Sequence, residues 1–225
     1  MDPYFVFSDV DGTIINKKSM FSFLKYYWRH SSNIGVLPAM LKYYGYLLNI
    51  YTGYARGKSR EIINKKYYEN FTDANLQEVF TLGNQWWRSV SCSKNIYNYH
   101  VIRELKSHQA LGAKIVLVSG SMPACINPLA KEINADYCLL TSLEVDGEYY
   151  TGKLTGQPNI NQGKKNKILE FLAKCTNSID LDHCYAYGDH HTDLPMLEMV
   201  GHPVAVGKNK VLVEIARERG WKIIR

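Results

Sequence analysis

The sequence predicts an α/β protein whose parallel sheet is interrupted, after its first strand, by a long helical segment. From about residue 95 onward, short apolar runs rich in β-branched and aromatic residues alternate with helical patterns. Such alternation is typical of a parallel sheet covered by helices on both faces. Residues 16–95 show helical periodicity instead. We therefore expect a core formed by residues 1–15 and 96–225, with residues 16–95 inserted into it.

The first strand is predicted at Tyr4–Phe7, an unbroken aromatic and β-branched run that is too short for a helix. Asp9 and Asp11 follow it, and then come Gly12 and Thr13. Two carboxylates at the end of a buried strand are costly unless a cation neutralises them. Mg²⁺ is the natural partner because it prefers oxygen ligands. The alternative is a solvated turn, in which Asp and Gly are common.

The inserted segment begins with apolar residues at helical spacing over 20–28, and amphipathic helices are expected over 59–71 and 73–87. Between the helical pattern over 20–28 and the helix over 59–71, the stretch Ile34–Ala55 is long, aromatic and nearly uncharged. A membrane span needs about 20 mostly apolar residues, and this stretch is interrupted by Pro38, Lys42 and several tyrosines. We therefore predict no transmembrane segment. Peripheral contact with lipid is the weaker alternative to helices packed in a small subdomain.

The C-terminal part contains the rest of the predicted sheet. Its strands are expected over 114–118, 137–140, 183–187, 203–206 and 221–224, and its helices over 97–111, 123–133, 164–175, 194–199 and 211–219. A hairpin is expected over 143–154, because Asp146-Gly147 lies between alternating residues. Open parallel sheets bind their ligands at the carboxyl ends of the strands, so residues that follow these strands are candidate site residues.

Three such positions carry polar groups that could serve a phosphate or a cation. Ser119 ends the strand over 114–118, Lys164 opens a helix, and Asp189 and Asp193 follow the strand over 183–187. Each also has a simpler structural role: a serine after a strand often caps the next helix, and a lysine in a first helical turn is usually solvated. Ser121 is the better candidate for a helix cap, since the next helix begins near Pro123.

In order and spacing, DVDGT, the serine at a strand end, the lysine and GDxxxD resemble the four motifs of the haloacid dehalogenase (HAD) superfamily of phosphohydrolases. The helical segment directly after the first motif resembles the cap of the phosphoserine-phosphatase-like branch (subfamily IB). The stretches MPACINPLAKEINADYCLLTSLEV and GDHHTDLPMLEMVGHPVAV are also similar to that branch. The resemblance implies a HAD-like Rossmannoid core of three layers with a parallel sheet, and an all-helical cap domain.

The resemblance also implies roles for the motif residues. Asp9 would be the nucleophile that forms an aspartyl-phosphate, and Asp11 would be the acid and base. Ser119, with the backbone N–H of Gly120, and Lys164 would bind the phosphoryl group. Mg²⁺ would be held by Asp9, Asp11 (through its carbonyl oxygen) and Asp189, and Asp193 would orient Asp189 or Lys164 from behind.

The substrate is less well defined. In the phosphoserine branch a Glu seven residues after the second aspartate binds the substrate amine, and Lys18 occupies that position here. This departure argues against phosphoserine itself and makes Lys18 a candidate specificity residue. Arg56, in the inserted segment, could meet a substrate carboxylate, although a lone arginine on a helix surface is usually solvated. We predict a phosphatase for a small phosphomonoester, such as a phosphorylated amino acid or a related metabolite. The alternatives are transfer to an acceptor other than water, and a non-catalytic module that binds a phosphorylated ligand or a membrane surface.

Composition limits the other function classes. The 225 residues are 46% hydrophobic and 21% charged, which is ordinary for a globular protein, and the net charge of +6 suits an anionic substrate. No basic run belongs to a recognised nucleic-acid module. The five cysteines are odd in number and lack a CxxC pair, which predicts reduced thiols in the cytoplasm and no zinc site. The acidic N-terminus, with Asp2, does not resemble a signal peptide.

Two histidines lie between the last two aspartates of the motifs. Imidazole suits zinc or iron, but the other candidate ligands are oxygens, which favours Mg²⁺. We therefore predict that His190 and His191 are exposed loop residues rather than metal ligands. The sequence carries no signal for an oligomeric state.

Overall fold

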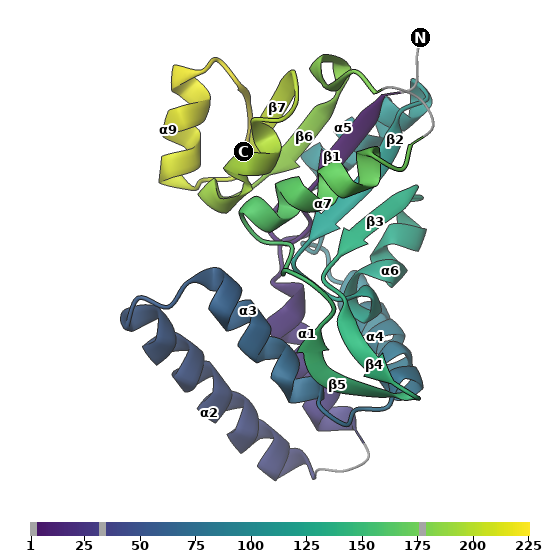
Figure 1. Cartoon of the computed structure of the whole chain (residues 1–225), viewed down its shortest axis with the longest axis vertical. Coiled ribbons are helices and arrows are strands. Elements are labelled where there is room, and N and C mark those ends of the chain that lie inside the picture. The colour runs from purple at the N-terminus through teal and green to yellow at the C-terminus, as the bar shows by residue number, and fades with distance from the viewer. Residues whose placement is uncertain (1–3, 32–34, 176–178) are drawn as a thin grey trace.

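The computed structural model describes residues 4–31, 35–175 and 179–225, so Asp2 and Ile34 of the analysis above lie outside the described residues. A six-stranded parallel sheet forms the upper part of the molecule in Figure 1, in the order β3-β2-β1-β6-β7-β8. Its strands are β1 (Phe5–Ser8), β2 (Lys114–Ser119), β3 (Tyr137–Leu140), β6 (Tyr185–Gly188), β7 (His202–Val206) and β8 (Lys222–Ile224).

The sheet is buried on both faces because its strands place apolar side chains alternately on each side. In β1, Val6 belongs to one core, whereas Phe5 and Phe7 belong to the other. The first core is completed by α5 (Tyr99–Ala110) and α6 (Pro123–Glu132). The second is completed by α7 (Gln162–Leu172), α8 (Leu194–Leu197) and α9 (Lys210–Glu218). The predicted α/β core of three layers is confirmed.

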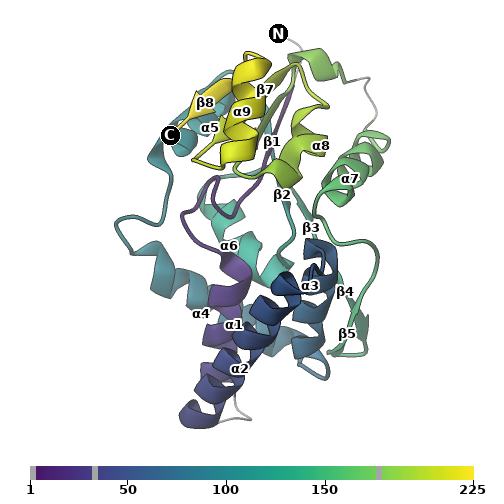
Figure 2. The ribbon, with the colours of Figure 1, turned by 90° about the vertical axis from the view of Figure 1, so that its left-hand side faces the viewer.

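The inserted segment between β1 and α5 is helical, as predicted, and lies at the other end of the molecule from the sheet (Figures 1 and 2). Aromatic side chains form much of its interior: the Phe23 ring stacks on Phe71 at 6.0 Å and meets Trp86 edge-on at 5.8 Å. The helices are α1 (Ser19–His30), α2 (Val36–Ala55), α3 (Arg60–Tyr68), the 3₁₀ helix η1 (Glu69–Phe71) and α4 (Leu76–Ser91).

The predicted hairpin, β4 (Leu143–Asp146) and β5 (Tyr149–Leu154), follows the inserted segment in sequence but packs against its helices. The N–H of Asp73 donates to the carbonyl of Tyr150 at 2.8 Å, and the N–H of Tyr150 donates to the carbonyl of Ala74 at 3.0 Å. The division of the chain into a core (1–15 and 96–225) and an inserted segment (16–95) stays a prediction. The hairpin belongs to the predicted core in sequence but packs against the helices of the inserted segment.

One predicted boundary moves because of a local turn. The strand expected over 183–187 begins at Tyr185, since Leu181–His183 forms a 3₁₀ helix. The side chain of Asp180 caps that helix by accepting the N–H of Asp182 at 2.9 Å. This capping removes His183 from the strand.

A glycine sets the distance between the inserted helices and the core. A Cβ atom on Gly83 of α4 would lie 2.2 Å from the carbonyl oxygen of Ala124 in α6. We expect Gly83→Ala to lower the free energy of unfolding by about 1–3 kcal/mol in urea titrations, because the two helices must separate.

The matched control is Gly45→Ala in α2, where an added Cβ meets no atom within 4 Å. Here alanine should raise the free energy of unfolding by up to about 1 kcal/mol, since it is the better helix former. Equal effects of the two substitutions would show that close packing at Gly83 is not needed.

Candidate active site

The candidate site lies where the strand order changes direction, at the carboxyl ends of the central strands. β2 and β3 lie to one side of β1, and β6, β7 and β8 lie to the other, so ligands are expected next to the ends of β1 and β6. A pocket is found there, between the sheet and the inserted helices. It is lined by Asp9, Asp11, Lys18, Met20, Phe21, Arg60, Ser119, Gly120, Ser121, Asn159, Ile160, Lys164, Asp189, His190, Thr192 and Asp193.

A buried lysine joins two aspartates from different motifs. The Nζ of Lys164 lies 2.5 Å from Oδ1 of Asp9 and 2.8 Å from Oδ1 of Asp193. Burial by itself lowers the pKa of Lys164, but the charges and hydrogen bonds of Asp193 and Asp9 outweigh burial and raise that pKa above its usual value. The other oxygen of Asp9 accepts the hydroxyl of Thr13 at 3.1 Å. Both oxygens of Asp9 are therefore held in position.

Asp11 is in a different environment from Asp9. Its Oδ2 accepts the backbone N–H of Ser19 at 2.8 Å and the Ser19 hydroxyl at 2.9 Å, whereas its Oδ1 is buried without a hydrogen-bond partner among the described residues. Burial, and then the charge of Asp9, raise the pKa of Asp11 to about 7. Asp11 can thus carry a proton or release it near neutral pH.

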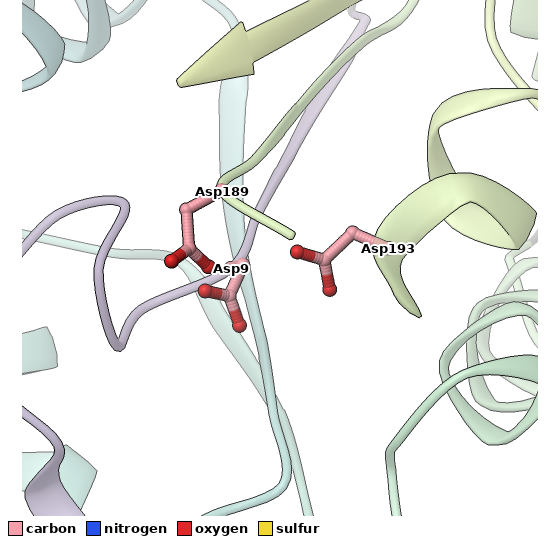
Figure 3. A group of neighbouring side chains, drawn as sticks. All are labelled: Asp9, Asp189 and Asp193. Carbon is pink, nitrogen blue, oxygen red and sulfur yellow. The ribbon is translucent and has the colours of Figure 1, made fainter. Parts of the chain in front are cut away.

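Three carboxylates lie near one another: Asp9 directly after β1, Asp189 directly after β6, and Asp193 in the 3₁₀ helix η3 (His191–Asp193) that follows (Figure 3). Single oxygens of Asp9, Asp189 and Asp193 lie within 4.8 Å of one another. Asp193, however, already accepts Lys164 with one oxygen and the N–H of His190 with the other, at 3.1 Å. Asp9 also accepts a hydrogen bond with each oxygen, so hydrogen bonding does not separate Asp9 from Asp193 as a partner of Asp189 in holding a cation.

Gly12 gives the Asp189 carboxylate room. A Cβ atom on Gly12 would lie 2.2 Å from Oδ2 of Asp189, and the φ of +103° at Gly12 also favours glycine. Burial, and then the charge of Asp9, raise the pKa of Asp189 to about 7. An added cation would relieve this repulsion between carboxylates.

The loop after β2 is held by a hydrogen bond within the loop and by hydrogen bonds from α3. Oγ of Ser119 accepts the N–H of Ser121 at 3.1 Å, so the Ser119 hydroxyl proton is available to a ligand. The carbonyl oxygen of Gly120 accepts two bonds from α3, from Nδ2 of Asn64 at 3.1 Å and from the hydroxyl of Tyr68 at 2.6 Å. The inserted helices thus orient the Gly120 peptide.

Ser121 does not cap α6, contrary to the prediction. Met122 is the N-cap residue and makes no side-chain cap bond. The Ser121 hydroxyl instead lies 2.5 Å from that of Ser19, which in turn donates to Asp11. Ser121 therefore supports the acid group rather than the helix.

Of the two basic residues that were expected to contact the substrate, Lys18 lines the pocket and Arg56 does not. Lys18 lines the pocket, donates to the carbonyl oxygen of Asp11 at 2.8 Å and lies 3.7 Å from Oδ2 of Asp189. Arg56 is exposed at the C-terminal end of α2 and is not among the lining residues. The structure places Arg60 in the pocket instead, since α3 begins there.

His190 differs from its prediction because Arg60 covers it. The residue is partly buried and lines the pocket, whereas His191 is exposed as expected. Nη1 of Arg60 donates to Nδ1 of His190 and to Oγ1 of Thr192, both at 3.0 Å. Burial and then the Arg60 charge lower the pKa of His190 to about 4. His190 is thus a neutral acceptor that positions Arg60.

The residues that support the site were not predicted from the sequence. Thr13 belongs to the DVDGT motif, so its contact with Asp9 had a sequence signal. Ser19, Asn64, Tyr68 and Arg60 had none, because they reach the motif residues only through the packing of α1 and α3.

Comparisons with known proteins found a matching family model, sequence relatives and solved structures of the same fold. The family model of the haloacid dehalogenase-like hydrolases matches residues 6–198. A probable phosphatase of Mycobacterium tuberculosis is 27% identical over 97% of this chain and 74% of its own length. A Bordetella pertussis protein of unknown function has the same fold, with a TM-score of 0.86, 22% identity and coverage of 100% of this chain and 99% of its own. A phosphoserine phosphatase, solved as a phospho-aspartyl intermediate analogue, has a TM-score of 0.66, 18% identity and coverage of 100% and 93%.

The raised pKa of Asp11 predicts how the stability of the metal-free protein depends on pH. Between the unfolded pKa, near 3.8, and the folded pKa of about 7, the folded state holds a proton that the unfolded state releases. The free energy of unfolding should therefore fall as pH rises from about 5 to about 7, by at most about 1.4 kcal/mol per pH unit for one such group.

Urea unfolding in the presence of a chelator measures this slope. Asp11→Asn is the control, because the amide does not titrate, and it should make the slope shallower; Asp189 still titrates in both proteins. Identical slopes for the two proteins would contradict the assignment to Asp11.

A second prediction concerns the hydroxyl of Tyr68. Tyr68→Phe removes one of the two donors to the Gly120 carbonyl, so we expect severalfold weaker binding of inorganic phosphate by calorimetry and a stability loss of about 1 kcal/mol. Tyr67→Phe is the matched control: Tyr67 is equally buried and donates to the carbonyl of Met20 at 2.8 Å. It should cost similar stability without weakening phosphate binding, and equal weakening in both variants would contradict the role of Tyr68.

Proposed function

The chain belongs to the haloacid dehalogenase-like hydrolases, and on that premise we propose that it hydrolyses a small phosphomonoester, with Mg²⁺, through an aspartyl-phosphate on Asp9. That it is a phosphoric monoester hydrolase follows from the family and from its phosphatase relative. The observation that carries the finer proposal is the position of Asp9. Its carboxylate ends the central strand, is held by Lys164 and Thr13, and points toward Asp189.

Asp9 is the nucleophile in this proposal. A carboxylate oxygen attacks the phosphorus atom, an O–P bond forms, and the bond to the leaving oxygen breaks. Asp11 gives its proton to that leaving oxygen, which departs as an alcohol. Asp11 then takes a proton from water, whose oxygen attacks the same phosphorus, so that phosphate leaves and Asp9 is restored.

The different environments of the two aspartates support this division of roles. Asp9 forms an ion pair with Lys164, whereas burial and the charge of Asp9 bring the pKa of Asp11 to about 7. One carboxylate is therefore suited to attack, and the other to transfer a proton at neutral pH.

The residues present fit a magnesium ion. The candidate ligands are all oxygen atoms: the carboxylates of Asp9 and Asp189 and the carbonyl oxygen of Asp11. Asp193 would stand behind them, because it holds Lys164 and the backbone of His190. When bound, the ion would neutralise charge on the phosphoryl oxygens. The Lys18 ammonium contacts two of these three groups and would have to move aside.

Phosphate would be bound by residues at the C-terminal end of β2 and in the first turn of α7. The free hydroxyl proton of Ser119 and the N–H of Gly120 can donate to phosphoryl oxygens, and Lys164 adds a positive charge. These groups act in a buried setting, where hydrogen bonds to a charged ligand are strong.

The basic residues at the pocket support a substrate with additional negative charge and no amine near Lys18. Lys18 and Arg60 both line the pocket, and Lys18 is half exposed, so a ligand can reach its ammonium. A phosphorylated amino acid or related metabolite remains the proposed class, with phosphoserine disfavoured. The cytoplasmic location inferred from the cysteines stays a prediction; all five thiols are free.

The test is Mg²⁺-dependent phosphate release from p-nitrophenyl phosphate and from a panel of phosphometabolites. We expect activity in the wild type, loss to the uncatalysed background in Asp9→Asn, and a lower kcat/KM for phosphoserine than for a phosphomonoester of similar size without an amine. Phosphate release by wild type that is no faster than by Asp9→Asn would overturn the proposal and favour a binding module. Product analysis with added alcohols would reveal transfer to an acceptor other than water.

A further inference from the structure

Helix α2 buries one face and exposes an equally apolar one. Ala39, Tyr43 and Ile50 are buried, and Ala39 and Tyr43 belong to the core that α2 shares with the neighbouring α1. On the opposite side, large side chains recur every three or four residues and are 55–72% exposed: Leu37, Leu41, Tyr44, Leu48 and Tyr51. Figures 1 and 2 place α2 at the outer edge of the molecule. We call these five residues the outer stripe.

The outer stripe is about as large as the largest apolar patch on a typical monomer. At roughly 200 Å² for each tyrosine side chain and less for each leucine, the exposed fractions correspond to an area on the order of 500 Å². This equals the largest patch expected on a typical monomer, about 300–600 Å², and such patches are often functional. A helix that is apolar on both sides normally has both sides covered.

The charge around the stripe points to what covers it. From Gly12 to Arg60 the sequence contains eight Lys and Arg residues and no Asp or Glu, although the whole chain is only +6. One of these cations contacts the stripe: Nζ of Lys25 is 6.0 Å from the ring centroid of Tyr44. Lys42 follows Leu41 in sequence, and its Nζ is 4.7 Å from the ring centroid of Trp28 in α1. A second copy would bring like charges together, whereas an anionic surface would attract them.

We propose that the outer stripe of α2 lies on the surface of a bilayer that contains anionic lipids. Leu and Tyr side chains would enter the boundary between headgroups and acyl chains, and the flanking Lys and Arg side chains would meet lipid phosphates. With 20 residues, α2 is about 30 Å long. None of the helices in the described ranges has the length and apolarity to cross a membrane, so α2 would lie in the plane of the surface.

The stripe leads directly to the candidate active site. Arg56 and Lys58 lie in the turn between α2 and α3, both exposed, and Arg60 after them lines the pocket. Arg56, which is absent from the pocket, would thus be a lipid-facing charge. Membrane docking rests on the outer stripe alone and does not depend on the proposed phosphatase chemistry.

Sedimentation of the whole chain with vesicles tests the proposal. We expect binding to vesicles of phosphatidylcholine mixed with phosphatidylglycerol, weak binding to phosphatidylcholine alone, and weaker binding at higher salt. Leu41→Gln with Leu48→Gln should weaken partitioning by about tenfold or more, because two exposed apolar side chains are lost.

Leu111→Gln with Leu169→Gln is the matched control, since these leucines are 61% and 46% exposed. Leu111 directly follows α5 and Leu169 lies in α7, and Figure 2 shows both helices at the other end of the molecule. It should bind like the wild type, and both double variants should keep solution phosphatase activity. Absence of binding to anionic vesicles, or equal binding by both double variants, would overturn the proposal. The proposal would also be overturned if light scattering showed that the wild type is a dimer, that Leu41→Gln with Leu48→Gln makes it a monomer, and that the wild type does not bind vesicles.

Discussion

The site depends on the buried ammonium group of Lys164. Asp9 belongs to the first motif and Asp193 to the last, and their buried carboxylates would repel each other. Lys164 lies between them, 2.5 Å and 2.8 Å from their oxygens, and it is itself only 4% exposed. Its positive charge therefore allows the C-terminal end of β1 and the η3 turn (His191–Asp193) to lie close together. The geometry proposed for the nucleophile follows from that arrangement.

The inserted helices complete the site from the other side. Asn64 and Tyr68 of α3 hold the Gly120 carbonyl, and Arg60 contacts His190 and Thr192 in the loop after β6. These contacts join the helices to two of the strand ends that carry the motifs. An insertion directly after β1 can act as a cover for this reason: its first helix starts next to Asp11 and its third returns to the pocket.

The same insertion has a second face with different chemistry. α3 brings polar and basic groups to the pocket, whereas α2 exposes leucine and tyrosine side chains on the outside, with basic but no acidic residues in the surrounding sequence. One small helical unit can therefore serve both a small anionic ligand and an anionic surface, because the two tasks use opposite sides of it.

Local patterns in the sequence determined the strands, the parallel sheet and the family, since an apolar run followed by Asp9 or Asp189 has few other interpretations. They also identified Lys164, because its position between Ser119 and Asp189 matches the third of the four motifs. Tertiary structure alone decided that Arg60 rather than Arg56 faces the pocket, that His190 is covered, that Ser121 supports Ser19, and that the hairpin lies with the helices. These features depend on how α3 docks against the strand ends. Spacing along the chain specifies which face of a helix is apolar, but not which of its polar residues meets a partner distant in sequence.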